Sequence, residues 1–409
     1  MRLLVFFFIF LEFLAGVIQA APTTNTTNTT TSDNVEAPSF TTRTLWTIIS
    51  SSILTLFACV YSAIHPNIPS HKDSGYPHII WRQLSMIIMA LIAPELIVTW
   101  AMRQRFSADQ WTQTHSFFVL MGGFMLYVDG EPYCTLQPNH ILKLIHEKCI
   151  DVPTLTAKQI HDKSKGNAIS KGVVVLQVAW FVIQLITRAI YHLETTQLEV
   201  GTLAFAVLNF LTYAAWWDKP LDVQCPYPVH WKSTGSKATV TPEYYIDEKY
   251  EITQFGPLSP FFRPILELVG YPGIPACCKL QVPTFDGSIK LVSYSDKIAL
   301  LLAGLLMATI FGGIHAMAWF FVFPTYQEQV LWRMSAVAIT CTPWFGLLTT
   351  ALLAAMNAPL KLFILLYALC TLFYIIARAV LLVLMFTTLR NLPPDAYKAL
   401  LWTSLVPHL

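Results

Sequence analysis

The stretch Leu362–Phe386 decides the class of this chain, and it reads LFILLYALCTLFYIIARAVLLVLMF. Arg378 is the only charged residue within it. A helix needs about 20 predominantly apolar residues to cross the hydrocarbon core of a bilayer. The segment therefore predicts a transmembrane helix near the C-terminal end of the chain.

The composition extends this prediction to the whole chain. Of 409 residues, 55% are hydrophobic and 12% are charged, whereas a soluble domain carries about 25% charged residues. A soluble fold of this length could not hide so much apolar surface. The net charge is only +2, which does not suggest a nucleic-acid partner. We therefore expect the lipid bilayer to be the main partner of the chain.

Eight segments are long and apolar enough to be transmembrane helices. Ala108–Val128 is the weakest of them because its first turn is polar. The eight are Leu45–Ile64, Trp81–Ala101, Ala108–Val128, Gly172–Leu193, Gln197–Trp217, Ile298–Phe323, Leu331–Ala355 and Leu362–Phe386. The fold class expected is an all-α integral membrane bundle with eight spans, or with seven if one segment is re-entrant.

The start of the chain has the features of a cleaved signal peptide. Met1–Ala20 has Arg2, a short apolar run and a small-residue exit. A first transmembrane helix is the alternative, but the run is short for a span. Residues 21–42 are rich in Thr, Asn and Ser and should form a disordered tail, glycosylated at Asn25 and Asn28. The remaining residues, 43–409, should form one polytopic membrane domain.

The lysines set an orientation. With a lumenal or extracellular N-terminus, alternation places residues 129–171 and 218–297 in the cytosol. These loops carry six lysines, and seven lysines with Arg263, respectively. This bias agrees with the positive-inside rule. The chain should therefore lie in an endomembrane of the secretory pathway or in the plasma membrane.

Ionisable residues inside spans are costly and often mark a function. Alternation places all of them here in the lumenal leaflet: Glu95, His115, Arg188, His315 and Arg378, with Glu328 and Arg333 on the outer connection. One interpretation is that they pair as structural contacts or reach the headgroups. The other is a polar cavity, for which Glu95, His115, His315, Glu328 and Arg333 are the candidate residues. No catalytic residue is assigned.

Small residues recur every four positions in one predicted span. They are Gly304, Ala308, Gly312 and Ala316, and on a helix they form a stripe that lets a neighbouring backbone approach. His315 lies beside this stripe and should face the bundle.

Sequence motifs of common enzymes are absent. The chain has no H-E-x-x-H, G-x-S-x-G, P-loop or G-x-G-x-x-G pattern, and its histidines lack the spacing of a di-iron desaturase. We therefore expect no metal site and no cofactor. A proton-initiated cyclase stays possible, since it needs only a buried acid such as Glu95.

Short motifs along nearly the whole chain resemble a large, poorly characterised family of multi-pass membrane proteins of filamentous fungi. The motifs are Ile64-His65-Pro66-Asn67, Ala93-Pro94-Glu95, His115-Ser116-Phe117-Phe118, Met121-Gly122-Gly123-Phe124, Trp216-Trp217-Asp218-Lys219-Pro220-Leu221-Asp222-Val223, Phe311-Gly312-Gly313-Ile314-His315, Phe323-Pro324-Thr325, Glu328 and Leu331-Trp332-Arg333. The resemblance implies an occasional association with secondary-metabolite gene clusters and carries no activity with it.

Three functional hypotheses remain open from the sequence. The first is an accessory membrane protein that binds or moves a small metabolite in specialised metabolism. The second is an integral membrane enzyme such as a proton-initiated cyclase or isomerase, and the third is a membrane sensor. The sequence predicts no oligomeric state.

Overall fold

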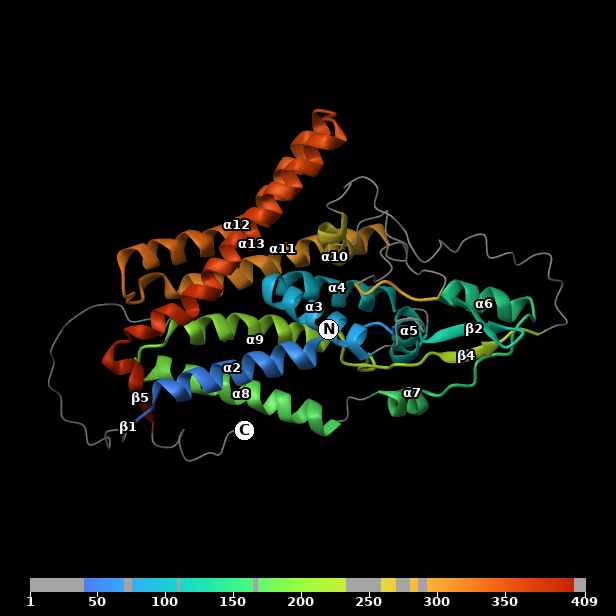
Figure 1. The fold of residues 1–409 in the computed structure, drawn as a ribbon, viewed down its shortest axis with the longest axis horizontal. Helices are drawn as coiled ribbons and strands as arrows, with labels where there is room; N and C mark the ends of the chain where they lie inside the picture. Colours follow the sequence, from blue (N-terminus) through green and yellow to red (C-terminus); the bar gives the residue numbers. More distant parts are fainter. Residues whose placement is uncertain are drawn as a thin grey trace. The chain divides into compact units, whose positions relative to one another are not determined.

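The computed structural model describes residues 40–69, 76–108, 111–164, 168–232, 259–269, 280–285 and 293–400. Twelve α-helices lie in these ranges (Figure 1): α2 Leu45–Ala63, α3 Tyr76–Ile92, α4 Pro94–Ser107, α5 Gln113–Leu120, α6 Pro138–His146, α7 Ala157–Lys163, α8 Ala168–Ile190, α9 Gln197–Ala215, α10 Ser259–Val269, α11 Tyr294–Ala316, α12 Tyr326–Ala355 and α13 Leu360–Thr387. Short 3-10 helices follow α11 at Met317–Phe320 and α13 at Thr388–Arg390 and Pro394–Tyr397. The predicted signal peptide, tail and glycosylation sites Asn25 and Asn28 lie outside the described residues.

The chain divides into two compact units. The first unit comprises Met1–Cys59, Gly172–Val207 and Ala308–Leu409, and the second comprises Val60–Lys171 and Leu208–Met307. We describe each unit separately below.

Within the described residues, six helices are long and apolar enough to cross a membrane. They are α2, Gly172–Ile190 of α8, α9, Tyr294–Phe320, α12 and Lys361–Arg390. A seventh crossing exists only if Ile79–Ile92 and Pro94–Ser107, which are bent by 111°, count as one span. Six of the eight predicted spans are thus continuous apolar helices in the structure.

The third predicted span, Ala108–Val128, is wrong. Its described residues include the eight-residue helix α5, a turn, and the strand β2 Phe124–Val128. Gly122 has a φ of 88°, in the left-handed region that stops a helix. A Cβ on Gly123 would lie 2.3 Å from the Phe118 carbonyl oxygen, so this close turn needs glycine. Eight residues span only about 12 Å as a helix, too little to cross a bilayer.

The second predicted span, Trp81–Ala101, is not one straight helix. It is divided between α3 and α4 at Ala93, which has a non-helical φ of −139°. The cause is Pro94, because a proline disfavours the helical conformation of the preceding residue and supplies no N–H for a helical hydrogen bond. Pro94 instead begins α4, where its missing N–H is not needed.

The described residues are mainly helical but also form two small sheets, so the all-α prediction needs a correction. In the second unit, β3 Glu131–Thr135 and β4 Tyr227–His230 flank β2, antiparallel and parallel respectively. In the first unit, β1 Phe40–Thr42 pairs antiparallel with β5 Lys398–Leu400, which brings the start of α2 beside the segment after α13 (Figure 1).

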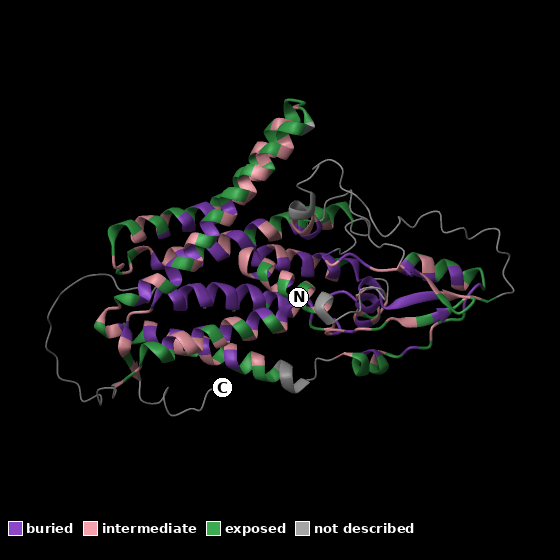
Figure 2. Ribbon diagram, in the orientation of Figure 1, coloured by how far each residue is buried: buried purple, intermediate pink, exposed green. Residues whose placement is uncertain are grey.

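Burial differs sharply among the long helices (Figure 2). In the most apolar 18-residue part of α9, 89% of the residues are buried, against 11% in α12. The outward residues of α12 and α13 are large and apolar, including Leu348, Leu352, Leu365 and Phe373. Such a surface suits contact with lipid, which removes the cost of exposing it to water.

The small-residue stripe on α11 is a helix contact, as the sequence predicted. A Cβ on Gly312 would lie 1.9 Å from Thr340 Oγ1 of α12. The side chain of Ala308 is 2% exposed. The α12 backbone therefore approaches α11 at a distance that only glycine permits.

Candidate functional site

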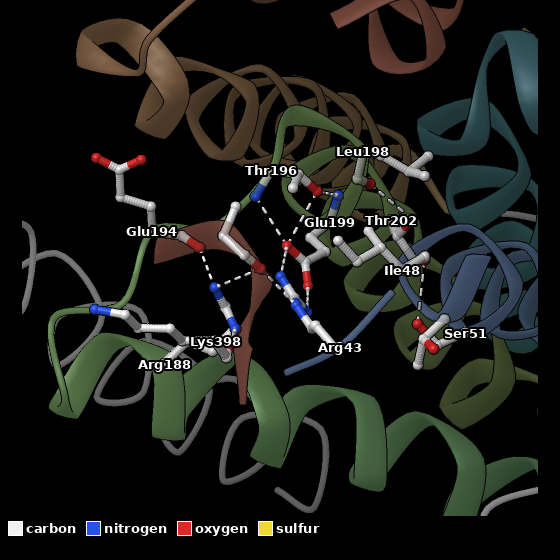
Figure 3. A network of polar contacts seen from close by, with 12 residues as sticks. Arg43, Ile48, Ser51, Arg188, Glu194, Thr196, Leu198, Glu199, Thr202 and Lys398 are labelled. Carbon is white, nitrogen blue, oxygen red and sulfur yellow. Dashed lines mark hydrogen bonds and ion pairs between the residues drawn. The ribbon is translucent and has the colours of Figure 1, made fainter. Parts of the chain in front are cut away.

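An ion pair between Arg43 and Glu199 in the first unit is largely buried (Figure 3). Arg43 Nη1 donates to Glu199 Oε1 at 2.5 Å and Nη2 donates to Oε2 at 3.2 Å. Glu199 is 3% exposed, and its Oε2 also accepts from the backbone N–H and hydroxyl of Thr196 at 2.8 and 3.0 Å. The Glu199 N–H in turn donates to Thr196 Oγ1 at 3.2 Å, so Thr196 caps α9. The forked guanidinium of Arg43 matches the carboxylate of Glu199, which neutralises it.

Arg188, at the end of α8, lies beside this pair and binds carbonyl oxygens. Its Nη1 donates to the Lys398 oxygen at 2.7 Å, and its Nη2 donates to the backbone oxygens of Glu194 and Asp395. Arg43 Nε also donates to the Ala396 oxygen at 2.7 Å. These two arginines join the start of α2 and the end of α8 to the segment after α13. We call Arg43, Arg188 and Glu199 the terminal belt.

A second buried cluster joins α11, α12 and α13. Arg378 and His315 are both 0% exposed, and Arg378 Nη1 lies 3.4 Å from His315 Nε2. The guanidinium carbon lies 4.1 Å from the centre of the Phe311 ring and 4.8 Å from that of Phe205. Trp332 Nε1 donates to the His315 carbonyl oxygen at 2.9 Å.

The contacts of His315 define its tautomer. Its Nδ1 lies 2.9 Å from the Phe311 carbonyl oxygen, which can only accept a hydrogen bond. Its Nε2 faces a guanidinium, which can only donate. Both contacts are satisfied when the neutral ring carries its proton on Nδ1.

Glu328 and Arg333 lie near the surface of the first unit. Arg390 donates to both carboxylate oxygens of Glu328 at 2.7 and 2.9 Å, and Thr325 caps α12 through the Glu328 N–H. Arg333 donates twice to the Trp319 carbonyl oxygen at 2.8 and 3.0 Å. These contacts stabilise the connection between α11 and α12.

The second unit holds a buried lysine, Lys219, in a cage of neutral oxygen atoms and indole rings. Lys219 is 2% exposed, and its Nζ donates to the His65 carbonyl oxygen at 2.5 Å, to Gln104 Oε1 at 2.8 Å and to Asn67 Oδ1 at 3.3 Å. Nζ also lies 4.4 Å from the centre of the Trp216 ring and 5.1 Å from that of Trp100. We call these residues the lysine cage.

The cage matches the three N–H donors of an ammonium with three oxygen acceptors. Burial lowers the pKa of Lys219 well below its ordinary value of 10.5, because it removes water from the charged form. Three acceptors and two indole faces act in the opposite direction and favour the proton. Among the described residues, no carboxylate forms an ion pair with Lys219.

Asn67 connects the cage to both arms of the α3–α4 pair. Its carbonyl oxygen accepts from Arg82 Nη1 of α3 at 3.2 Å, and its Oδ1 accepts from Gln104 Nε2 of α4 at 3.2 Å. Trp216 Nε1 donates to Gln104 Oε1 at 3.0 Å. Close by, Arg103 of α4 donates to the carbonyl oxygens of Glu267, Leu268 and Phe285 at 2.9–3.1 Å.

The predicted cavity residues fall into two groups. His315, Glu328 and Arg333 belong to the first unit, and Glu95 and His115 to the second. Glu95 is buried in the first turn of α4. His115 lies on α5 rather than in a span, and its Nε2 lies 2.9 Å from the Leu155 carbonyl oxygen. A common cavity for the five stays a prediction.

Some residues of these sites were missed in the sequence. Glu199 has a signal, because Thr196 and Glu199 have the spacing of a capping box. Gln104 and Trp100 have none, since neither is charged and neither belongs to a recognisable motif. In contrast, the Ile64–Asn67 and Trp216–Lys219 motifs, quoted above for the family resemblance, meet in the lysine cage. Among the described residues, no group of His, Cys, Asp or Glu could hold a metal ion.

The long apolar helices and buried cationic clusters define a helical protein with six or seven possible membrane spans. A model described as "Family of unknown function (DUF8562)" matches residues 8–109 and 101–238. The chain belongs to this family. No curated protein and no solved structure matches the chain.

Proposed function

We propose that this chain is a multi-pass protein of the fungal secretory or plasma membrane that binds or moves a small metabolite of specialised metabolism. The six continuous apolar helices support the membrane part of the proposal. The buried contact between His315 and Arg378 is the observation that carries the binding part.

The orientation proposed has the N-terminus in the lumen or outside the cell. Met1–Ala20, the acceptors Asn25 and Asn28, and the lysines of residues 129–171 support it. Because β1 pairs with β5, the proposal also places the segment after α13 on the same side of the membrane as the start of α2. The expected result is that Asn25 and Asn28 are glycosylated and that a tag in residues 129–171 is protected from external protease in sealed vesicles. Glycosylation of the two asparagines together with cleavage of the tag would place residues 129–171 on the same side as the N-terminus.

His315 and Arg378 lie in helices that would cross the bilayer, where a charged side chain is costly. Arg378 is stacked on Phe311 and Phe205, so a cation and aromatic faces occur together. This combination suits a metabolite with an apolar body and an oxygen that can accept from a guanidinium.

The binding proposal is tested by extracting the protein from its native membrane and identifying bound small molecules by mass spectrometry. His315→Gln and Arg378→Gln should reach the membrane in normal amounts and lose the bound molecule. Arg390→Gln is the matched control, because it breaks the exposed pair with Glu328 and should keep the molecule. Retention of the molecule by both test variants would exclude this cluster as the binding site. If both variants fail to accumulate, Phe205→Leu, which only removes an aromatic face, takes their place.

The cyclase alternative depends on Glu95 acting as an acid. Glu95 is buried in the first turn of α4. The buried contact between His315 and Arg378 favours the binding role instead. Turnover of a supplied metabolite by purified protein, lost in Glu95→Gln, would support the enzyme instead.

A further inference from the structure

The α3–α4 pair turns back on itself, and two contacts made at its outer ends show this. Arg82 of α3 and Gln104 of α4 both bind Asn67. Each lies about ten residues from the break, which corresponds to about 15 Å along a helix. The bend of 111° exceeds a right angle, so α4 runs back toward the side from which α3 comes.

The lysine cage gives an independent reason to place both ends of the α3–α4 pair on one side of the membrane. His65 and Asn67 follow the end of α2, and Lys219 follows the end of α9. Since Lys219 binds both, α2 and α9 end on the same side of the membrane. Between these two ends lie α3–α4, α8 and α9. The number of crossings among them must be even, and α8 and α9 already supply two.

The β1–β5 pairing also requires an even number of crossings, here between Thr42 and Lys398. Thr42 precedes α2, and Lys398 follows α13. Two residues paired in one sheet lie on one side of the membrane, so the crossings between them must be even in number. Six crossings fit this condition, and seven do not.

From these contacts we infer that α3–α4 is a re-entrant hairpin, which enters one leaflet and leaves on the same side. Its tip is Ala93-Pro94-Glu95, at most about 15 Å deep, or half of a hydrocarbon core of about 30 Å. The part of the chain that the structure describes then crosses the bilayer six times. The inference needs membrane insertion but no ligand and no particular orientation.

The surface of α3 shows what surrounds the hairpin. Ile80, Leu84 and Ile88 follow one another at helical spacing and are 46%, 42% and 44% exposed. Trp81, near the outer end, is 69% exposed, in the position where an indole prefers the headgroup level. This face continues the apolar surface of a membrane protein, and its occupant is the acyl chains of one leaflet.

Cysteine labelling in sealed vesicles tests the hairpin. Pro69→Cys lies before α3, Thr154→Cys lies after α4, and Val322→Cys on the α11–α12 connection marks the opposite side. Each is made in a Cys225→Ser parent, whose own labelling is subtracted. An impermeant maleimide should label the first two from one side and Val322→Cys from the other. Labelling of Pro69→Cys and Thr154→Cys from opposite sides would show one crossing and overturn the inference.

Two further measurements keep this test decisive. Each cysteine is first labelled in detergent, and a position that does not react receives an epitope tag in its place. Ile88→Lys should greatly reduce the folded yield, since a charge would enter the leaflet. Leu142→Lys is the control, because Leu142 is 47% exposed on α6, outside the spans. Equal yields of both variants would mean that α3 faces water. Reversed labelling of all three cysteines would contradict only the proposed orientation.

Discussion

The terminal belt of the first unit and the lysine cage of the second bury cationic side chains by different means. In the first unit, Arg43 is neutralised by the carboxylate of Glu199, while Arg188 beside it binds backbone oxygens. In the second unit, neutral oxygens and indoles surround Lys219. A carboxylate supplies a full opposite charge, whereas carbonyl oxygens replace only the water that the ammonium has lost. The first arrangement should therefore depend strongly on one residue, and the second should distribute its effect over several.

Glu199→Gln should have the largest effect. It leaves Arg43 without its carboxylate partner, and breaking a buried pair in this way costs about 3–5 kcal/mol. The measurement is thermal stability in detergent. Glu194→Gln is the control, because Glu194 contacts Arg188 through its backbone oxygen. Similar midpoints for the two variants would mean that the Arg43–Glu199 pair contributes little.

Glycine substitutions on α11 should give the next largest effect, and they compare the two units directly. Gly312→Ala, in the first unit, would place a Cβ 1.9 Å from Thr340 Oγ1, and overpacking costs about 1–3 kcal/mol. Gly304→Ala, in the second unit, meets Thr99 Oγ1 at 3.2 Å and should cost less. Gly313→Ala meets nothing within 4 Å and should be neutral or slightly stabilising. A different order of detergent midpoints would contradict the packing.

Lys219→Met should cost only about 1 kcal/mol. The variant loses hydrogen bonds from a charged donor, each worth about 1.5–3 kcal/mol, but it also removes the cost of burying an ammonium. Lys158→Met, at an exposed position on α7, is the control. A loss of stability as large as that of Glu199→Gln would mean that the lysine cage depends on one residue as strongly as the Arg43–Glu199 pair does.

The smallest effect expected is a change with pH. Burial lowers the pKa of Lys219 in the folded state, so above that pKa the unfolded chain binds more protons than the folded one. Stability then rises with pH until it levels off near the ordinary lysine pKa of 10.5. From about pH 7.5 to pH 9.5, the midpoint of the wild type should rise relative to that of Lys219→Met. A constant difference would mean that the cage keeps its proton throughout.

The sequence predicted the continuous helices well because lipid-facing segments must be apolar over a fixed length. It misassigned Ala108–Val128, since an apolar core strand and an apolar short helix together have the composition of a span. Gly122-Gly123 is a turn signal within this segment. The apolar residues around Gly122-Gly123 favoured the interpretation of one continuous span instead.

The candidate sites were predictable only where charge marks them. Arg188, His315 and Arg378 are conspicuous in apolar segments, and the structure places each in a buried contact. The lysine cage depends on Gln104, Asn67 and two indoles, whose positions are set by contacts between segments more than 100 residues apart. A single sequence holds no record of such long-range contacts.

The pairing of β1 with β5 has a consequence for synthesis of the chain. Thr41 bonds to Ala399, 358 residues later, and the acceptors of Arg188 at Asp395 and Lys398 are also translated near the end. At about 5–20 residues per second, the nascent chain would hold Arg188 without these acceptors, and Arg43 without the Ala396 oxygen, for many seconds. A chain truncated before Asp395 would carry the same deficiency permanently, and quality control in the membrane could recognise it.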